Sequence, residues 1–345
     1  MIKGITRCAT AAMLLTMLSV VNAEPALANS ANVDPLPSWN EGRTKSTIFD
    51  FVQETTTEGS KNFVQPQDRI ATFDQDGTLW VEHPLYTQYL YILSKTNGIV
   101  QHNPSLAEHE PFKTILSGDM KKISELSNAD IFRIAIMAQD GMSVEDYSAD
   151  VVKWLETARD PRWNRPYTDL IYQPMLELME YLRENGYKTY IVTGGGQDFV
   201  RTYSDRVYGI PPEQIAGTSF STQFKYDKDG KAFLALQPSL FFNDDFGGKA
   251  EGIGLFIGKR PHFSAGNSTG DREMLEYTTS GDGARLGMLV FHDDAQREYA
   301  YGPAQGLPAS NVGTFSQSLY DEATTKNWSI ISMKNDWKTI FKFEQ

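Results

Sequence analysis

The stretch that decides the fold is residues 69–79, with the sequence RIATFDQDGTL. A short apolar run ends abruptly there in two acidic residues, Asp74 and Asp76, which Gly77 follows. Such continuous apolar runs are typical of buried parallel strands. In open α/β sheets, ligands bind beyond the carboxyl ends of these strands. The stretch therefore predicts a buried strand that carries two carboxylates into a functional site.

Asp74 and Asp76 are two positions apart, and a turn at Gly77 would let both face one small volume. Like charges a few ångströms apart raise each other's pKa unless a cation lies between them. We therefore expect a divalent metal ion here, with a solvated turn as the alternative. An EF-hand calcium loop is excluded, because it needs glycine at its sixth position and Gly77 is the fourth residue counted from Asp74.

The rest of the chain alternates between predicted strands and helices, as a parallel α/β sheet requires. Apolar periodicity predicts strands over residues 187–192, 261–265 and 286–290, and helices over residues 169–185, 197–208 and 271–279. Alternating apolar positions around an Asp-Gly turn predict a β-hairpin over residues 218–242. Residues 83–166 show helical periodicity and no strand pattern. We expect an α/β fold with a parallel sheet flanked by helices and with an inserted helical module.

The first residues have the pattern of a secretory signal peptide. Basic residues precede an apolar run over residues 9–21, and small residues close it before Ala23. We expect cleavage after Ala23, with Ala28 as the alternative, and a secreted, periplasmic product. The one cysteine of the chain, Cys8, lies in this segment. The cleaved protein would therefore have neither disulfides nor thiolate chemistry.

These boundaries predict four parts. Residues 1–23 are the signal peptide, and residues 24–47, rich in Pro, Ala, Asn and Ser, form an N-terminal arm. The α/β core comprises residues 48–82 and 167–345, and the helical module comprises residues 83–166. No other stretch is long and apolar enough to span a membrane, so we expect no membrane association after signal cleavage.

The composition and net charge of the chain exclude some classes of function. The 345 residues are 40% hydrophobic and 22% charged, which is typical of a folded globular protein, and their formal net charge is −12. Such an acidic chain repels nucleic acids, so we expect no nucleic-acid partner. An anionic substrate would need a local cation to attract it. The sequence sets no oligomeric state.

The motif at residues 74–78 resembles that of the haloacid dehalogenase (HAD) superfamily, whose phosphatase members carry Asp-x-Asp-Gly-Thr after the first core strand. The partners of that motif follow in the family's order. Thr193 ends a predicted strand, Lys249 follows two glycines, and Asn267 and Asp271 lie in Gly-Asn-Ser-Thr-Gly-Asp. The resemblance covers about residues 65–290. It implies a Rossmann-like parallel sheet with an inserted helical cap, as in the phosphoserine-phosphatase-like branch.

The resemblance implies that Asp74 is a nucleophile that forms an aspartyl-phosphate. Asp76 would protonate the leaving alkoxide and later deprotonate the attacking water. Dehalogenase members lack this second Asp, so its presence favours a phosphate ester over a carbon–halogen bond. Thr193 and the amides of Gly194 and Gly195, at a helix N-terminus, would bind the phosphate oxygens.

Lys249 would neutralise the nucleophile and the phosphate. Lys259 and Arg260 are the alternatives for this role, and Lys249 is preferred because the family places this lysine before a helix, well upstream of the last motif.

A magnesium ion would bind one oxygen of Asp74, the main-chain carbonyl of Asp76 and the last motif, because this ion prefers oxygen ligands. Asn267 replaces the first acidic residue of that motif. Whether Asn267 or Asp271 contacts the ion stays open at this point.

The helical module would select the substrate. In the phosphoserine-phosphatase-like branch an acidic residue just beyond Asp-x-Asp contacts the amine of the substrate. Glu82 has a similar place in this sequence. The alternative, to which we give equal weight, is that Glu82 is a carboxylate at the N-terminus of a helix. For Arg159, Arg162 and Arg165, a solvated basic face is preferred to a site for a substrate carboxylate. His292, at the end of a predicted strand, has no assigned role beyond lining the site.

The sequence thus predicts a secreted, magnesium-dependent hydrolase of small phosphate monoesters. One alternative is a non-catalytic protein that binds phosphate or divalent ions on the same fold. Another is a phosphonate-cleaving enzyme, which would need a reactive lysine in the cap.

Overall fold

The computed structural model describes residues 34–344, so the predicted signal peptide and the first part of the predicted arm lie outside the described residues. Seven strands form one sheet with the order β4-β3-β2-β1-β5-β6-β7. Every neighbouring pair is parallel except β3 with β4. The strands are β1 Ile70–Phe73, β2 Lys188–Gly196, β3 Ile215–Tyr226, β4 Ala232–Phe242, β5 Phe263–Gly266, β6 Leu286–Phe291 and β7 Ser329–Ser332. The predicted α/β fold is confirmed.

Residues 70–73, from the stretch quoted at the start of the sequence analysis, form the central strand β1. In β1, Phe73 lies opposite Ile191 of β2 and Ala265 of β5, and all three are 0% exposed. Burying a side chain of the size of Phe73 or Ile191 contributes about 1.5–3 kcal/mol. Because β1 is held on both sides, the residues after Phe73 leave the sheet at a fixed point, between the carboxyl ends of β2 and β5.

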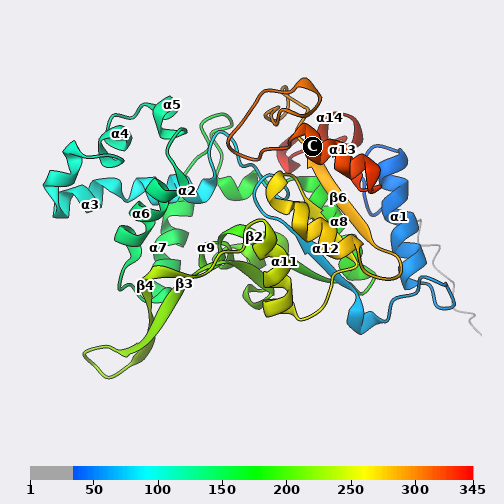
Figure 1. Ribbon diagram of the computed structural model, residues 1–345, viewed down its shortest axis with the longest axis horizontal. Helices are drawn as coiled ribbons and strands as arrows, with labels where there is room; N and C mark the ends of the chain where they lie inside the picture. The colour runs from blue at the N-terminus through cyan, green and yellow to red at the C-terminus, as the bar shows by residue number, and fades with distance from the viewer. Residues whose placement is uncertain (1–33, 345) are drawn as a thin grey trace, which may run out of the picture. The chain divides into compact units, whose positions relative to one another are not determined.

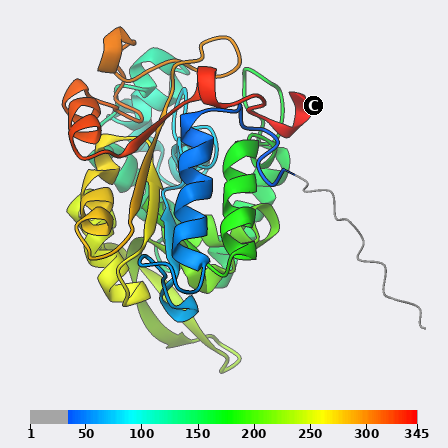
Figure 2. The same cartoon turned by 90° about the vertical axis from the view of Figure 1, so that its right-hand side faces the viewer.

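Helices cover both faces of the sheet. Helices α1 (Arg43–Thr56) and α8 (Gln173–Glu184) lie side by side over one face (Figure 2), where the rings of Phe49 and Tyr181 meet edge to face. Helices α11 (Gly247–Gly252), α12 (Arg272–Thr279) and α13 (Gln317–Thr325) lie on the other side (Figure 1). Separate hydrophobic clusters fill the two faces. This two-sided burial explains the continuous apolar pattern of the inner strands.

Helices fill the chain between β1 and β2. They are α2 Thr87–Ser94, α3 Thr96–His102, α4 Phe112–Leu116, α5 Met120–Ile123, α6 Asn128–Gln139 and α7 Val144–Thr157. Serine caps begin the two longest, with Ser127 accepting from the amide of Asp130 and Ser143 from that of Asp146. Figure 1 shows this group beyond the edge of the sheet that ends in β4.

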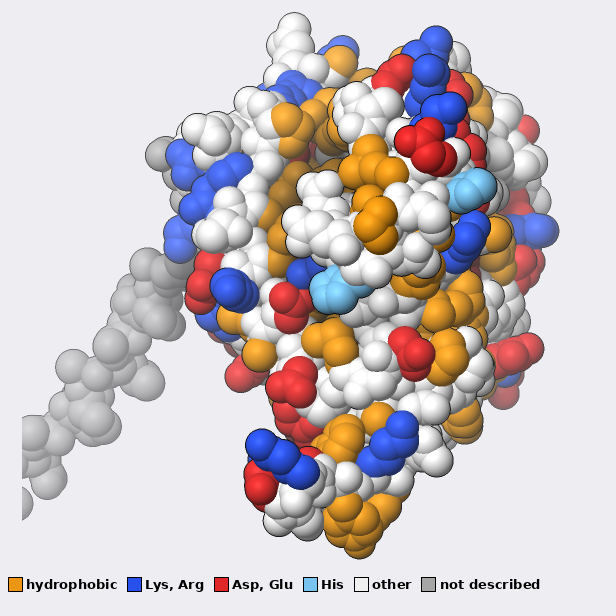
Figure 3. Space-filling model, turned by 90° about the vertical axis from the view of Figure 1, so that its left-hand side faces the viewer, with side chains coloured by type: hydrophobic (Ala, Val, Ile, Leu, Met, Phe, Trp, Pro, Cys, Tyr) orange, Lys and Arg blue, Asp and Glu red, His pale blue; other side chains and the backbone are white. Residues whose placement is uncertain are grey.

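The predicted hairpin is formed by β3 and β4, which turn at residues 227–230. Near its base, Phe220 stacks on Phe132 of α6 with ring centroids 5.4 Å apart. Farther out, Phe224, Tyr226 and Leu234 are exposed. Figure 3 shows apolar and basic side chains together at the projecting end.

Three local predictions differ from the structure. Helix α1 begins at Arg43, inside the predicted arm, and Trp39 before it is buried in a bridge to Trp337. The helix predicted over residues 197–208 is two short helices, α9 (Gln197–Arg201) and α10 (Ser204–Tyr208). Helix α13, strand β7 and helix α14 (Met333–Asp336) were not predicted. Among residues 34–344, no helix is long and apolar enough to cross a membrane.

Candidate active site

A cavity of about 220 Å³ opens at the carboxyl ends of β1 and β2, where residues from both strands meet the loops after β4 and β5. The order of the sheet reverses at β1, with β2 on one side and β5 on the other. This is the position at which open α/β sheets bind ligands. The predicted residues that line the cavity are Asp74, Asp76, Glu82, Thr193, Gly194, Gly195 and Lys249.

A buried ammonium group joins the motifs. Lys249 of α11 contacts Asp74 at 2.5 Å and Asp271 at 2.6 Å, and it donates to the carbonyl of Val192 at 3.2 Å. All three charged side chains are less than 10% exposed. Burial alone would lower the pKa of Lys249, but the carboxylates of Asp271 and Asp74 raise it. Lys249 is therefore held as a cation beside Asp74.

The alternatives to Lys249 lie elsewhere. Lys259 pairs with Asp68 at 2.7 Å near the amino end of β1, and Arg260 donates to the carbonyl of Tyr277. Neither of them lines the cavity.

Asp271 is fully engaged by the protein. Besides Lys249, its carboxylate accepts from the amides of Asn267 and Ser268, each at 2.9 Å. The side-chain oxygen of Asn267, in contrast, faces Thr78. Its Oδ1 and an oxygen of Asp74 both lie 3.3 Å from the hydroxyl of Thr78, so these two oxygens converge on one point.

Asp76 lies on the loop that follows β1, and its Oδ1 accepts a hydrogen bond from the Trp80 indole at 2.7 Å. Burial raises the pKa of Asp76 to about 6, and the Trp80 hydrogen bond and Lys249 offset part of that effect. A carboxyl group with a pKa near neutrality is suited to give and take a proton at working pH.

Thr193 is buried at the cavity, and its hydroxyl accepts from the amide of Gly195 at 3.0 Å. Gly194 and Gly195 lie just before the predicted helix and not in its first turn. Strand β2 continues through Gly196, because Gly196 pairs with Thr218 of β3, and α9 begins only at Gln197. The glycines line the cavity as extended backbone.

Glu82 is 2% exposed and precedes α2 by several residues, so it does not cap that helix. Its Oε1 accepts from Asn267 and from the hydroxyl of Tyr301, each at 2.7 Å. Burial raises the pKa of Glu82 well above its usual range. Glu82 therefore lies at the cavity wall and is held there by two protein donors.

The basic residues of the return hinge do not line the cavity. Arg162 donates to the carbonyls of Ala295, Gln296 and Glu298, whereas Arg159 donates to carbonyls of its own segment. Arg165 lies near Asp169 on the surface. The structure thus agrees with a structural and surface role for these arginines.

The donor set suits a magnesium ion. Among residues 34–344, no three Asp, Glu or His side chains form a metal-binding group. However, the carboxylate of Asp74, the main-chain carbonyl of Asp76 and the amide oxygen of Asn267 are all hard oxygen donors near one cavity. Magnesium is commonly held by one or two carboxylates together with waters and substrate phosphate, and this set meets that requirement.

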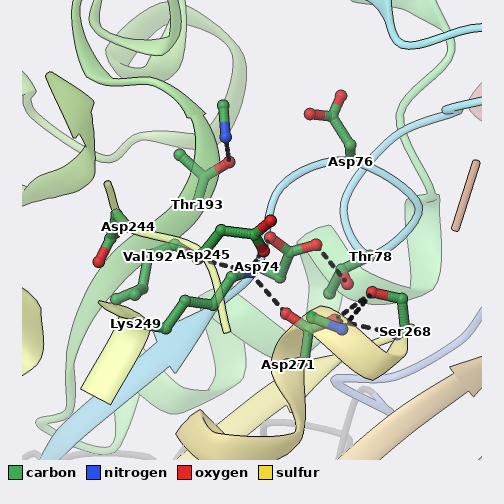
Figure 4. A network of polar contacts seen from close by, with 12 residues as sticks. Asp74, Asp76, Thr78, Val192, Thr193, Asp244, Asp245, Lys249, Ser268 and Asp271 are labelled. Carbon is green, nitrogen blue, oxygen red and sulfur yellow. Dashed lines mark hydrogen bonds and ion pairs between the residues drawn. The ribbon is translucent and has the colours of Figure 1, made fainter. Parts of the chain in front are cut away.

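Sequence reasoning missed several residues at the site. Gln88 accepts from the amide of Gly196 at 2.6 Å, and Asp245 lines the cavity beside Lys249. In Figure 4 the carboxylate of Asp245 points toward Asp74, whereas Asp244 points away. Asp245 follows a strand and lies just before the Gly-Gly-Lys motif. This position in the sequence could have identified it as a site residue.

The haloacid dehalogenase-like hydrolase family model matches residues 69–236. Residues 69–236 thus form a haloacid dehalogenase-like hydrolase domain. No curated protein sequence matches it. The matched residues hold β1, the helices that follow it, β2 and Thr193.

Several solved structures are similar to the chain, and one of them, with a TM-score above 0.5, shows the same fold. A functionally unknown protein of Anaerococcus prevotii DSM 20548 is 13% identical with a TM-score of 0.51, covering 86% of this chain and 94% of its own. A protein of unknown function from Bordetella pertussis Tohama I is 14% identical with a TM-score of 0.48, covering 76% and 97%. A phosphoserine phosphohydrolase-like protein of Francisella tularensis subsp. tularensis SCHU S4 is 18% identical with a TM-score of 0.37, covering 65% and 88%.

Gly77 provides a test of the loop. Its φ is +72°, and a Cβ there would lie 2.1 Å from the amide nitrogen of Asn267 and 2.3 Å from Glu82. We expect Gly77→Ala to cost more unfolding free energy than the ~1–2 kcal/mol that a left-handed residue costs by itself. Gly230→Ala is the matched control, because Gly230 has φ +79° and open space around it. Urea unfolding measures both, and equal losses would show that Gly77 is not closely packed.

Proposed function

We propose that this hydrolase cleaves small phosphate monoesters through an aspartyl-phosphate on Asp74. The observation that carries the proposal is the contact of Asp74 with Lys249 at 2.5 Å in a cavity that Asp76 and Thr193 also line. It supports a site in which Asp74 is the nucleophile, Lys249 the cation, Asp76 the proton carrier and Thr193 the hydroxyl donor. Phosphoryl transfer needs these groups.

In the first step an oxygen of Asp74 bonds to phosphorus, the ester P–O bond breaks, and Asp76 gives its proton to the departing alkoxide. In the second step Asp76 takes a proton from water, the water oxygen bonds to phosphorus, and the acyl phosphate bond to Asp74 breaks. The Thr193 hydroxyl donates to the phosphate oxygens during both steps, and the positive charge of Lys249 attracts them. The products are an alcohol and inorganic phosphate, and Asp74 and Asp76 return to their starting states.

Magnesium would be held by Asp74, the carbonyl of Asp76 and Asn267, and when bound it supplies positive charge to the phosphate oxygens. The structure supports Asn267 over Asp271 for this role, because both oxygens of Asp271 already accept hydrogen bonds within the protein. Asn267 directs its Oδ1 to the Thr78 hydroxyl, beside Asp74.

The inserted helices of residues 83–166 act as a cap in this proposal, since Gln88, Tyr89 and Asn128 from them line the cavity. A cap excludes water from the acyl phosphate. Secretion to the periplasm remains part of the proposal and rests on the signal-peptide pattern of residues 1–23.

The alternatives have less support. Phosphonate cleavage through a Schiff base needs a cap lysine at the site, but the lysine that lines the cavity is Lys249, outside the cap. Lys95 of the cap pairs with Asp150. A protein that only bound phosphate or cations would not need the proton carrier Asp76.

Removing the nucleophile should abolish turnover. We expect Asp74→Asn to lower kcat at least about a thousandfold, as loss of a nucleophile does, and to leave the fold intact because the side chains are nearly equal in size. Asp282→Asn, an exposed site before β6, is the control and should keep full activity. The assay is release of inorganic phosphate from a generic phosphate ester. An Asp74→Asn variant with a tenth of the normal activity would contradict the mechanism.

Removing the metal should also silence the enzyme. The cavity has four carboxylates, Asp74, Asp76, Glu82 and Asp245, against one lysine, so an anionic substrate is repelled unless a further cation is present. We expect dialysis against a chelator to abolish phosphate release and added magnesium to restore it. Full activity after chelation would show that the site works without a divalent ion.

A further inference from the structure

The charge balance of the cavity limits what the leaving group can carry. Within residues 34–344, Lys249 is the one basic side chain that lines the cavity. Its three hydrogen-bond donors already meet acceptors in the protein, on Asp74, Asp271 and Val192. Beyond the phosphate position, no Lys, Arg or His of the described chain remains at the cavity to bind a second anion.

The same space is suited to a cation. The rings of Tyr86 and Tyr89 meet edge to face on the cavity wall with centroids 5.2 Å apart. Burial raises the pKa of Tyr89 to about 12, and the nearby carboxylates of Asp245 and Asp76 add to the effect. Aromatic faces beside carboxylates bind ammonium groups through cation–π and charge interactions.

The segment of Asp245 and Phe246 contributes the opposite lining. Asp245 lines the cavity and points toward Asp74 (Figure 4). Phe246 has a φ of +52° and is 54% exposed although it is aromatic. A bulky residue in this left-handed conformation is uncommon, and such strain is concentrated at functional sites. The segment therefore presents one carboxylate and one ring to the substrate.

We propose that the cavity selects phosphate esters of amino alcohols that carry no second anion. The phosphate would lie between Lys249 and Thr193, and the ammonium group would lie against Tyr89 and Asp245. A carboxylate on the same leaving group would meet Asp245 without a counter-cation, so it is rejected. This proposal rests on the proposed phosphatase function and names its substrate class.

The sharpest test compares O-phosphoethanolamine with O-phosphoserine, because these two compounds differ by one carboxylate. We expect kcat/KM for phosphoethanolamine to be about ten- to a hundredfold higher, the range of one charge-assisted contact. n-Propyl phosphate, which has a neutral leaving group, should fall between them. All three are measured with magnesium on the full-length enzyme by phosphate release.

Two variants assign the effect to residues. Asp245→Asn should reduce the preference for phosphoethanolamine over n-propyl phosphate about tenfold. Asn128→Lys adds the missing cation at the cavity and should raise phosphoserine turnover relative to phosphoethanolamine. Asp282→Asn, which changes the net charge equally but lies outside the cavity, should leave both ratios unchanged.

The outcomes separate the two levels of the proposal. Phosphoserine turnover equal to or above that of phosphoethanolamine would overturn the substrate class and leave the phosphatase function standing. Ratios that Asp245→Asn and Asn128→Lys do not move would also overturn it. No hydrolysis of these esters or of a generic aryl phosphate would overturn the phosphatase function itself, and the substrate class with it.

A second inference rests on a different observation, a buried pair behind the loop of residues 74–79. The ring of His292 contacts the carbonyl oxygen of Gly77 through Nε2 at 2.8 Å and Glu298 through Nδ1 at 3.1 Å. His292 is 2% exposed and Glu298 is 0% exposed. Tyr301 stacks on His292 with centroids 4.4 Å apart and donates to Glu82.

The chemistry of these contacts fixes the proton on Nε2. A carbonyl oxygen can only accept, so Nε2 of His292 donates to Gly77. Nδ1 then faces a carboxylate oxygen of Glu298 at 3.1 Å. The ring is thereby locked in orientation, as carboxylate–histidine pairs lock metal ligands and catalytic bases in other proteins.

The geometry points to His292 and Glu298 as positioning residues that hold the Gly77 turn and hence the Asp76 carboxyl group. His292→Leu removes the donor to Gly77 and should lower kcat by about ten- to a hundredfold, since small misplacements of a reacting group cost that much, with little change in KM. His292→Gln keeps an N–H donor and should restore most of kcat.

His262→Leu is the matched control, because His262 contacts the carbonyl of Ala284 at the amino end of β5. It should affect stability without lowering kcat. If His292→Leu fails to fold, Glu298→Gln carries the test, and it should lower kcat severalfold at unchanged KM. Unchanged kcat in folded His292→Leu or Glu298→Gln protein, or an equal loss in His262→Leu, would overturn the positioning role.

Discussion

The buried ammonium of Lys249 is the interaction on which the rest of the site depends. It lies between Asp74 and Asp271, which leave β1 and β5 at the same edge of the sheet. Leaving a buried charge unpaired costs several kcal/mol, so α11, β1 and the loop after β5 must meet where they do. The strand order then sets the rest, because β2 lies beside β1 and brings Thr193 to the same edge.

The cavity thus has one cation, Lys249, which is already paired with carboxylates of the protein, and more carboxyl groups than basic groups. That balance makes a metal ion and the substrate's own groups part of the electrostatics. A site that binds a leaving group with a carboxylate would need a further basic side chain, which the charge balance of this cavity does not include. The hinge arginines could have supplied one, but the carbonyls of residues 295–298 hold Arg162 away from the cavity.

Much of this arrangement could be predicted from the sequence. The strand before Asp74, the hairpin at residues 227–230 and the fold class follow from local patterns of apolar, acidic and turn residues. The choice of Lys249 over Lys259 needed the family order. The structure brings Asp74, Asp76, Thr193, Lys249 and Glu82 to one cavity.

The remainder could not be predicted, because it depends on contacts between distant parts of the chain. Glu82 meets Tyr301 across 219 positions, and His292 meets Gly77 across 215. No local pattern marks such pairs. The extension of β2 through three glycines was missed for a similar reason, because pairing with β3 overrides their weak strand propensity. Trp39, which precedes helix α1, packs against Trp337 near the other end of the chain.

The central claim is that Asp74 carries the phosphoryl group during turnover. The most direct measurement is to quench the wild-type enzyme with acid while it turns over a phosphate ester, and then to reduce it with borohydride, which converts an acyl phosphate to an alcohol. Peptide mass spectrometry then locates the change. The account predicts reduction at Asp74, only in samples quenched with substrate present. Reduction or phosphorylation at a different residue, with Asp74 unmodified, would contradict it.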